Sequence, residues 1–102
     1  MIVVSVLYAN KGSFNEGYYH DTHMKMVRDR WQDMGLTDVR FLKGQATPDG
    51  GHVPYRLITL LSFESMEKFQ QAAGKHGPEI FADIPNFTDV PPMVQINDMV
   101  EG

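Results

Sequence analysis

The chain has 102 residues, of which 42% are apolar and 22% are charged, so we expect one folded domain over residues 1–102 and exclude a disordered chain. Thirteen acidic residues against nine basic ones give a net charge of -4, which disfavours nucleic acid and anionic membrane surfaces as partners. The absence of cysteine excludes disulfides, thiolate nucleophiles and metal sites with cysteine ligands. No segment is typical of a signal peptide or a transmembrane helix, and we expect a soluble cytoplasmic protein.

The first part of the chain predicts a strand, a helix and a second strand. The β-branched run Ile2–Ala9 is typical of a strand. Asn15 suits a helix N-cap and Gly35 suits a C-cap, and apolar or aromatic side chains recur between them at helical spacing. This stripe consists of Tyr19, His23, Val27 and Trp31. The segment Thr37–Lys43 predicts the second strand.

A third strand and a second helix follow an exposed turn. Tyr55–Phe63 is the strand, and Ser65 is the expected N-cap of the helix. The helix has a stripe of apolar residues at i, i+3 and i+4 spacing, made of Met66, Phe69, Ala72 and Ala73. Gly74 and Gly77 are expected to end it.

The last part of the chain predicts one short helical turn, an irregular segment and a fourth strand. Pro78 is expected to open a helical turn that runs through Asp83. Three prolines make Ile84–Pro92 irregular, and Met93–Val100 is the strand. The Asp, Asn and Thr residues between Asp83 and Asp89 are expected to form a structured loop.

The order of these elements is βαββαβ, which predicts an α+β ferredoxin-like fold with one four-stranded antiparallel sheet. In that topology Ile2–Ala9 and Tyr55–Phe63 are the central strands. Both carry apolar residues on both faces, whereas a sheet face in water alternates apolar with polar residues. We therefore expect a homodimer that packs through the sheet faces.

Several stretches resemble a known family. They are Ser5–Tyr8, Tyr18–Met24, Phe63–Ser65 and Ala82–Asp89, and the similarity runs nearly end to end. The chain resembles the EthD-like proteins of the dimeric α+β barrel superfamily. One departure is Lys25-Met26, where the family pattern continues Pro-Leu. The missing proline removes a helix breaker, so we expect a straighter first helix than in relatives.

The resemblance implies a homodimer in which two sheets form a barrel, with a pocket in each subunit between helices and sheet. The family is associated with ethyl tert-butyl ether degradation beside a partner oxygenase system, and its members are often labelled reductases. Related folds carry out cofactor-free chemistry on aromatic and polyketide substrates. Family membership alone does not choose among these reactions.

His23 is the candidate catalytic residue, because it is the one side chain on the first helical stripe that transfers protons near neutral pH. The alternative is a structural histidine that fixes the helix on the sheet. His20 lies three residues earlier, but without a third ligand at helical spacing we expect no metal site. Gly50-Gly51 lacks the pattern of a phosphate or dinucleotide loop, so we expect no cofactor.

Aromatic residues are numerous enough to line a cavity for a small apolar molecule, although such residues also fill ordinary cores. The candidate substrate-binding residues are Tyr8, Tyr19, Trp31, Phe63, Phe81 and Phe87. Two functions stay open. One is a cofactor-free enzyme, whether oxidoreductase, isomerase, cyclase or lyase, with His23 as acid and base. The other is a non-catalytic protein that binds a ligand or assists a partner oxygenase.

Overall fold

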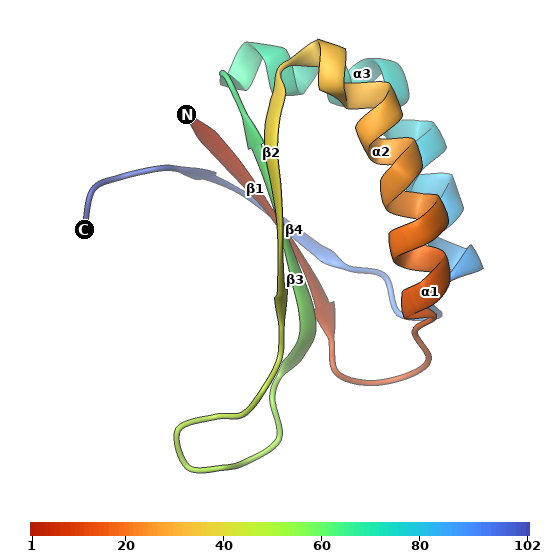
Figure 1. The fold of residues 1–102 in the computed structure, drawn as a ribbon, viewed down its shortest axis with the longest axis vertical. Coiled ribbons are helices and arrows are strands. Elements are labelled where there is room, and N and C mark those ends of the chain that lie inside the picture. The colour runs from red at the N-terminus through yellow and green to blue at the C-terminus, as the bar shows by residue number, and fades with distance from the viewer.

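The computed structural model describes residues 1–102 as one antiparallel sheet with all its helices on one face (Figure 1). In chain order the elements are β1 (Ile2–Ala9), α1 (Glu16–Tyr18), a π-helical turn (Tyr19–His23), α2 (Met24–Trp31), a 3₁₀ turn (Gln32–Met34), β2 (Leu36–Lys43), β3 (Tyr55–Phe63), α3 (Met66–Asp83), a second 3₁₀ turn (Ile84–Asn86) and β4 (Met93–Asp98). This confirms the predicted α+β ferredoxin-like fold. None of the helices combines the length and the apolar composition that a membrane span requires.

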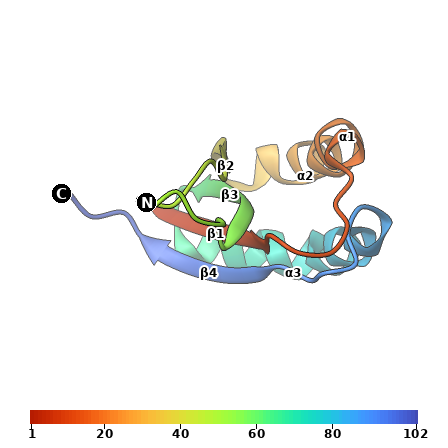
Figure 2. The same cartoon turned by 90° about the horizontal axis from the view of Figure 1, so that it is seen from below.

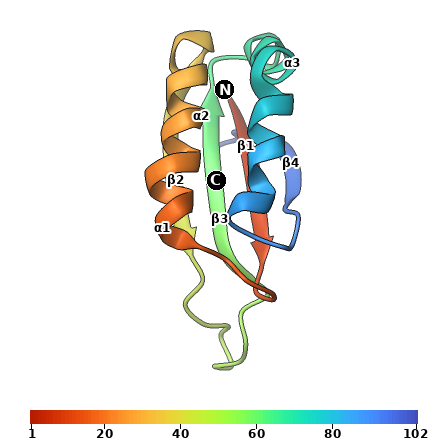
Figure 3. The same ribbon diagram turned by 90° about the vertical axis from the view of Figure 1, so that its right-hand side faces the viewer.

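The strand order is β2-β3-β1-β4, so β1 and β3 are central as predicted. Figure 3 shows α1 and α2 over β2 and β3, and α3 over β1 and β4. Viewed from below, the helices lie on one side of the sheet and the C-terminus extends from the other (Figure 2). Val4 pairs with Leu61 and Ile96, and these three side chains face the helices. The opposite face of the sheet has no covering layer.

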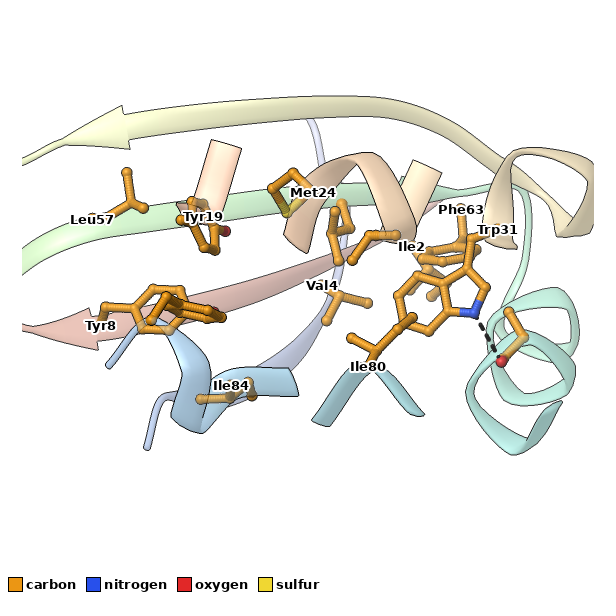
Figure 4. Packing of buried hydrophobic residues seen from close by; sticks show 14 residues of the cluster. Ile2, Val4, Tyr8, Tyr19, Met24, Trp31, Leu57, Phe63, Ile80 and Ile84 are labelled. Carbon is orange, nitrogen blue, oxygen red and sulfur yellow. Dashed lines mark hydrogen bonds between the residues drawn. The ribbon is translucent and has the colours of Figure 1, made fainter. Parts of the chain in front are cut away.

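The core lies between the sheet and the helices. Figure 4 shows Tyr8 and Tyr19 at one end of the apolar cluster and Trp31 and Phe63 at the other. Phe63 is completely buried and packs edge to face against Trp31, with 5.5 Å between ring centroids. The Trp31 Nε1–H donates a 2.9 Å hydrogen bond to the Ala72 carbonyl oxygen, which ties α2 to α3.

The first helical segment follows the predicted stripe but is not one uniform helix. The Asn15 side chain accepts a hydrogen bond from the Tyr18 backbone N–H at 3.0 Å, which confirms the N-cap. Every residue of the stripe from Tyr19 to Trp31 is buried. A π-helical turn at Tyr19–His23 interrupts the α-helix, and such turns are frequent at functional sites.

The second helix differs from the prediction, because α3 continues from Met66 to Asp83 without ending at Gly74 or Gly77. Glycine and proline inside a helix cost roughly 1 and 3 kcal/mol. The residues beyond Pro78 offset this cost by burial, since Ile80 is almost fully enclosed in the core. Tertiary packing therefore overrides the local propensity that suggested a break.

The end of the chain also differs from the prediction. β4 stops at Asp98 and not at Val100, because Asp98 pairs with Ile2, the first residue of β1. Beyond it, the Met99 N–H donates one backbone hydrogen bond to the Met1 carbonyl oxygen at 3.2 Å, but Met99 is not part of the strand. The segment between α3 and β4 is less irregular than expected, because it begins with the 3₁₀ turn and Thr88 forms an isolated bridge with Phe14.

The turn after the first helical segment requires a glycine at position 35, and this requirement can be tested by substitution. Its φ is +98°, a left-handed conformation, and an added Cβ would lie 2.7 Å from the Lys68 Cβ. We expect Gly35→Ala to lower the free energy of unfolding by about 1–2 kcal/mol. Gly74 is the control, because it lies in α3 with open space around it, and Gly74→Ala should raise stability by about 0.5–1 kcal/mol. Urea unfolding measures both, and equal effects would contradict this assignment.

Candidate active site

A small cavity of about 70 Å³ lies between the helices and the sheet. Val6 and Tyr8 of β1 and Thr59 of β3 contribute to its wall from the sheet side. Apolar side chains predominate around it, and His23 is the one titratable group near neutral pH on its wall. The cavity therefore combines the apolar lining and the few polar groups that are typical of small-molecule sites.

His23 is held in one orientation. The residue is only 3% exposed, and its Nδ1 lies 2.9 Å from Oδ2 of Asp83. The ring stacks on Tyr19 at 5.6 Å between centroids and contacts the Phe87 ring at 4.7 Å. Its other nitrogen, Nε2, makes no hydrogen bond within the chain and is not a fully enclosed atom. The arrangement leaves Nε2 available to a molecule in the cavity.

Asp83 is itself positioned by two further side chains. The Tyr18 hydroxyl donates to Oδ1 of Asp83 at 2.7 Å, and the Asn86 side-chain amide donates to the same oxygen at 2.9 Å. Because Oδ2 accepts from His23, both carboxylate oxygens are engaged. These contacts join the first helical segment to the end of α3 and its following 3₁₀ turn. The carboxylate is therefore held in a fixed position beside Nδ1 of His23.

The protonation states of the pair follow from their surroundings. Burial lowers the pKa of His23 below its ordinary value, and Asp83 opposes this shift without cancelling it. Burial alone would raise the pKa of Asp83, but hydrogen bonds from Tyr18, Asn86 and His23 outweigh it and lower that pKa. Near neutral pH the site therefore holds a carboxylate and a neutral imidazole. An ionised carboxylate only accepts hydrogen bonds, so Nδ1 carries the imidazole proton and Nε2 is the basic atom.

The lowered pKa of His23 predicts how stability depends on pH. The unfolded chain binds this proton at a higher pH than the folded chain does, so the contribution of His23 is complete above about pH 6.5 and is lost as the pH falls below it. We expect the wild type to lose more stability than His23→Gln between about pH 7.5 and about pH 5.5. Urea unfolding at both pH values measures this, and the other three histidines are common to both proteins. Equal losses would show that the pKa of His23 is not lowered.

Three residues with hydroxyl groups, Tyr8, Tyr19 and Thr59, contribute to the cavity wall. Tyr19 and Thr59 share a buried hydrogen bond between their hydroxyl oxygens. The Tyr8 ring packs edge to face on Tyr19 at 5.5 Å between centroids. Burial raises the pKa of Tyr19 to about 12, and burial with the neighbouring Tyr19 raises the pKa of Tyr8. Both phenols therefore stay protonated hydrogen-bond donors at neutral pH.

The predicted aromatic residues do not all lie at the cavity. Tyr8, Tyr19, Trp31 and Phe81 contribute to its wall. Phe63 lies in the core between Trp31 and Phe69 and is not part of the wall. Phe87 also lies outside the wall, and its ring packs against the rings of His23 and Tyr8.

A second hollow lies at the end of the sheet where the 44–54 loop projects, and it has a different character. It is wide and open, with a volume of about 1010 Å³, and Arg56, Lys43 and Asp89 contribute polar groups to it. Lys43 pairs with Glu16 at 3.3 Å, and Asp89 accepts from the Ser13 backbone N–H at 2.9 Å. His23 does not line this hollow, so the smaller cavity is the candidate active site. No group of three or more His, Asp and Glu side chains is arranged to hold a metal ion.

Comparison with solved structures connects this geometry to known proteins. An EthD-like protein from Ralstonia eutropha JMP134 is 34% identical to this chain, with a TM-score of 0.88 over 98% of this chain and 92% of the other. The chain belongs to the EthD-like family. An EthD family protein from Bacillus halodurans C-125 has the same fold, with 20% identity, a TM-score of 0.80, and coverage of 98% of this chain and 99% of the other. No family model and no curated protein matched the chain.

For this EthD-like protein, sequence reasoning missed the residues behind His23. The sequence predicts none of Asp83, Tyr18 and Asn86 as site residues, and it predicts only a structured loop between Asp83 and Asp89. Asp83 lies 60 positions from His23 in sequence, and no local pattern reveals such a pairing. The one usable signal was the presence of both segments, Tyr18–Met24 and Ala82–Asp89, among those that resemble the family.

Proposed function

We propose that this EthD-like protein binds a small apolar molecule in the cavity and transfers protons to and from it with His23. The contact between His23 Nδ1 and Asp83 is the observation that carries this proposal, because it leaves a basic Nε2 beside an apolar cavity. Asp83 stabilises the imidazolium that forms when Nε2 accepts a proton. The chemistry requires no cofactor, since an imidazole can both remove and return a proton.

The cavity dimensions restrict the ligand. A volume of about 70 Å³ is well below the roughly 300–1,000 Å³ of sites for drug-sized molecules. Phe81 contributes to the wall and is 54% exposed, and Val94 of the neighbouring β4 does so at 43%. These two side chains reach both the cavity and solvent, so a ligand can extend between α3 and β4. An engineered cavity that binds benzene measures about 150 Å³, so a small ring fits here only if part of it extends between α3 and β4.

Filling the cavity tests the binding part of the proposal. Ala73 contributes to the wall, so Ala73→Leu should weaken the binding of benzene at least tenfold, because the added side chain occupies the space. Ala46→Leu is the control, because Ala46 is exposed in the 44–54 loop. An NMR titration of the His23 ring signals measures binding. Equal affinity in Ala73→Leu and the wild type would place the ligand elsewhere.

The uncovered face of the sheet supports a homodimer as the functional form. Strand register places Val3, Leu7, Leu42, Ile58, Leu60 and Met93 on this face. Leu42 is 49% exposed and Met93 is 64% exposed. The same face also carries polar residues, Ser5 and Ser62 on the central strands and Asp38, Arg40, Gln95 and Asn97 on the outer strands. A mostly apolar face with charged groups only near its edge is typical of protein interfaces, and a second copy offers a face of the same shape.

A further inference from the structure

The hydroxyl of Tyr8 has no role in the proton transfer described above. Its O–H donates to the Tyr19 oxygen in a weak hydrogen bond, while Tyr19 bonds more closely to Thr59. Tyr8 is only 3% exposed overall and contributes to the cavity wall. A carbonyl oxygen in the cavity can therefore accept the Tyr8 O–H in place of the Tyr19 oxygen.

The Tyr8 hydroxyl and the His23 Nε2 belong to the same site. The rings of Tyr8 and His23 both pack against Tyr19, at 5.5 and 5.6 Å between centroids. Both also pack against Phe87, at 5.8 and 4.7 Å. A neutral hydrogen-bond donor and a neutral base thus lie on one apolar cavity wall. Apart from these groups and the Tyr19–Thr59 pair, the wall offers few polar atoms to a ligand.

A donor and a base in one apolar cavity suit a particular class of carbon acid. We propose that the substrate class is small, mostly apolar carbonyl compounds with a hydrogen on the carbon next to the carbonyl, and that Tyr8 binds the carbonyl oxygen. This inference rests on the proposed acid and base role of His23. A carboxylate substrate fits less well, because no cationic side chain lines the cavity.

The step balances without an oxidant or a reductant. His23 Nε2 takes the proton from the carbon next to the carbonyl, and the electrons of that C–H bond form the C=C bond of an enolate. The carbonyl π electrons move to oxygen, where the Tyr8 O–H donates a hydrogen bond to the developing charge. The imidazolium then returns the proton to the same carbon or to another one. The net reaction is proton exchange or isomerisation.

A pair of ligands of nearly equal shape tests this assignment. Cyclohexanone has the carbonyl oxygen, and methylenecyclohexane has a CH₂ group in its place. We expect the wild type to bind cyclohexanone roughly three to ten times more tightly, because one net hydrogen bond distinguishes the ligands. Tyr8→Phe should abolish the difference. Tyr55→Phe should retain it, because Tyr55 does not contribute to the cavity wall.

Deuterium exchange in the bound ketone supplies the second readout, and the outcomes separate the two proposals. Tyr8→Phe should slow exchange next to the carbonyl by about 10²–10³-fold, because it removes the donor to the enolate oxygen. Equal affinity for the two ligands in the wild type would overturn the carbonyl assignment but leave an apolar binding site. Exchange that depends on His23 but not on Tyr8 would overturn the role of Tyr8 alone. Failure of both ligands to bind would overturn this inference and the proposed function together.

Discussion

Replacing His23 by glutamine should slow proton exchange in bound cyclohexanone by about 10²–10⁴-fold, which is the usual contribution of a positioned acid and base. Glutamine keeps similar volume and can still donate to Asp83, so the variant removes the basic Nε2 with little change in packing. Solution NMR in D₂O measures the exchange rate. The affinity for methylenecyclohexane should change little, because that ligand makes only apolar contacts.

His20→Gln is the matched control for this variant. His20 is exposed, lies one turn away on the same helical segment and does not contribute to the cavity wall. We expect it to exchange protons at the wild-type rate. If His23→Gln also exchanged at the wild-type rate, with folding intact, His23 would be a structural residue. The alternative of a non-catalytic binding or accessory protein would then be favoured.

A charge at the centre of the uncovered sheet face should dissociate the proposed dimer. Leu60 lies on central strand β3 and faces away from the helices. Leu60→Arg would bury an unpaired charge between two copies and should weaken association by roughly 3 kcal/mol or more, which is over a hundredfold. Sedimentation at micromolar concentration should show a dimer for the wild type and a monomer, of reduced stability, for the variant.

Met66→Arg is the control for the dimer experiment. Met66 is partly exposed at the start of α3, on the side of the sheet that the helices cover. This variant introduces the same charge and should remain a dimer. A stable wild-type monomer at micromolar concentration would contradict the proposal. The apolar residues of the uncovered sheet face would then require another partner, because leaving them in water costs roughly 1.5–3 kcal/mol for each large side chain.

Hydrophobic periodicity predicted most of the fold. Apolar residues on both faces of β1 and β3 predicted the two central strands, and the helical spacing from Tyr19 to Trp31 predicted which side chains of the first helical segment are buried. The continuity of α3 through Pro78 was not predictable in this way, because it depends on the burial of Ile80 against elements far away in sequence. The π-helical turn at Tyr19–His23 also has no local signature in the sequence.

The site was predictable only in part, for a similar reason. His23 stood out as the one proton-transferring group on a buried stripe. Its partner Asp83 comes from another helix, and the cavity exists only because side chains from three strands and two helical segments leave a space unfilled. Pairings between distant segments and unfilled space are properties of tertiary packing, and one sequence does not contain a local pattern for either.

The protonation of the His23 ring is the most direct test of whether this cavity contains a base held by Asp83. Two ¹⁵N chemical shifts report which ring nitrogen carries the proton. We predict a neutral ring at pH 7 with the proton on Nδ1, a pKa below the ordinary 6.5, and a further decrease in that pKa in Asp83→Asn, because Asp83 is the group that raises it. Asp29→Asn, which alters an exposed pair with Lys25, should leave it unchanged. A proton on Nε2, or a ring that is charged at pH 7, would contradict the proposed mechanism.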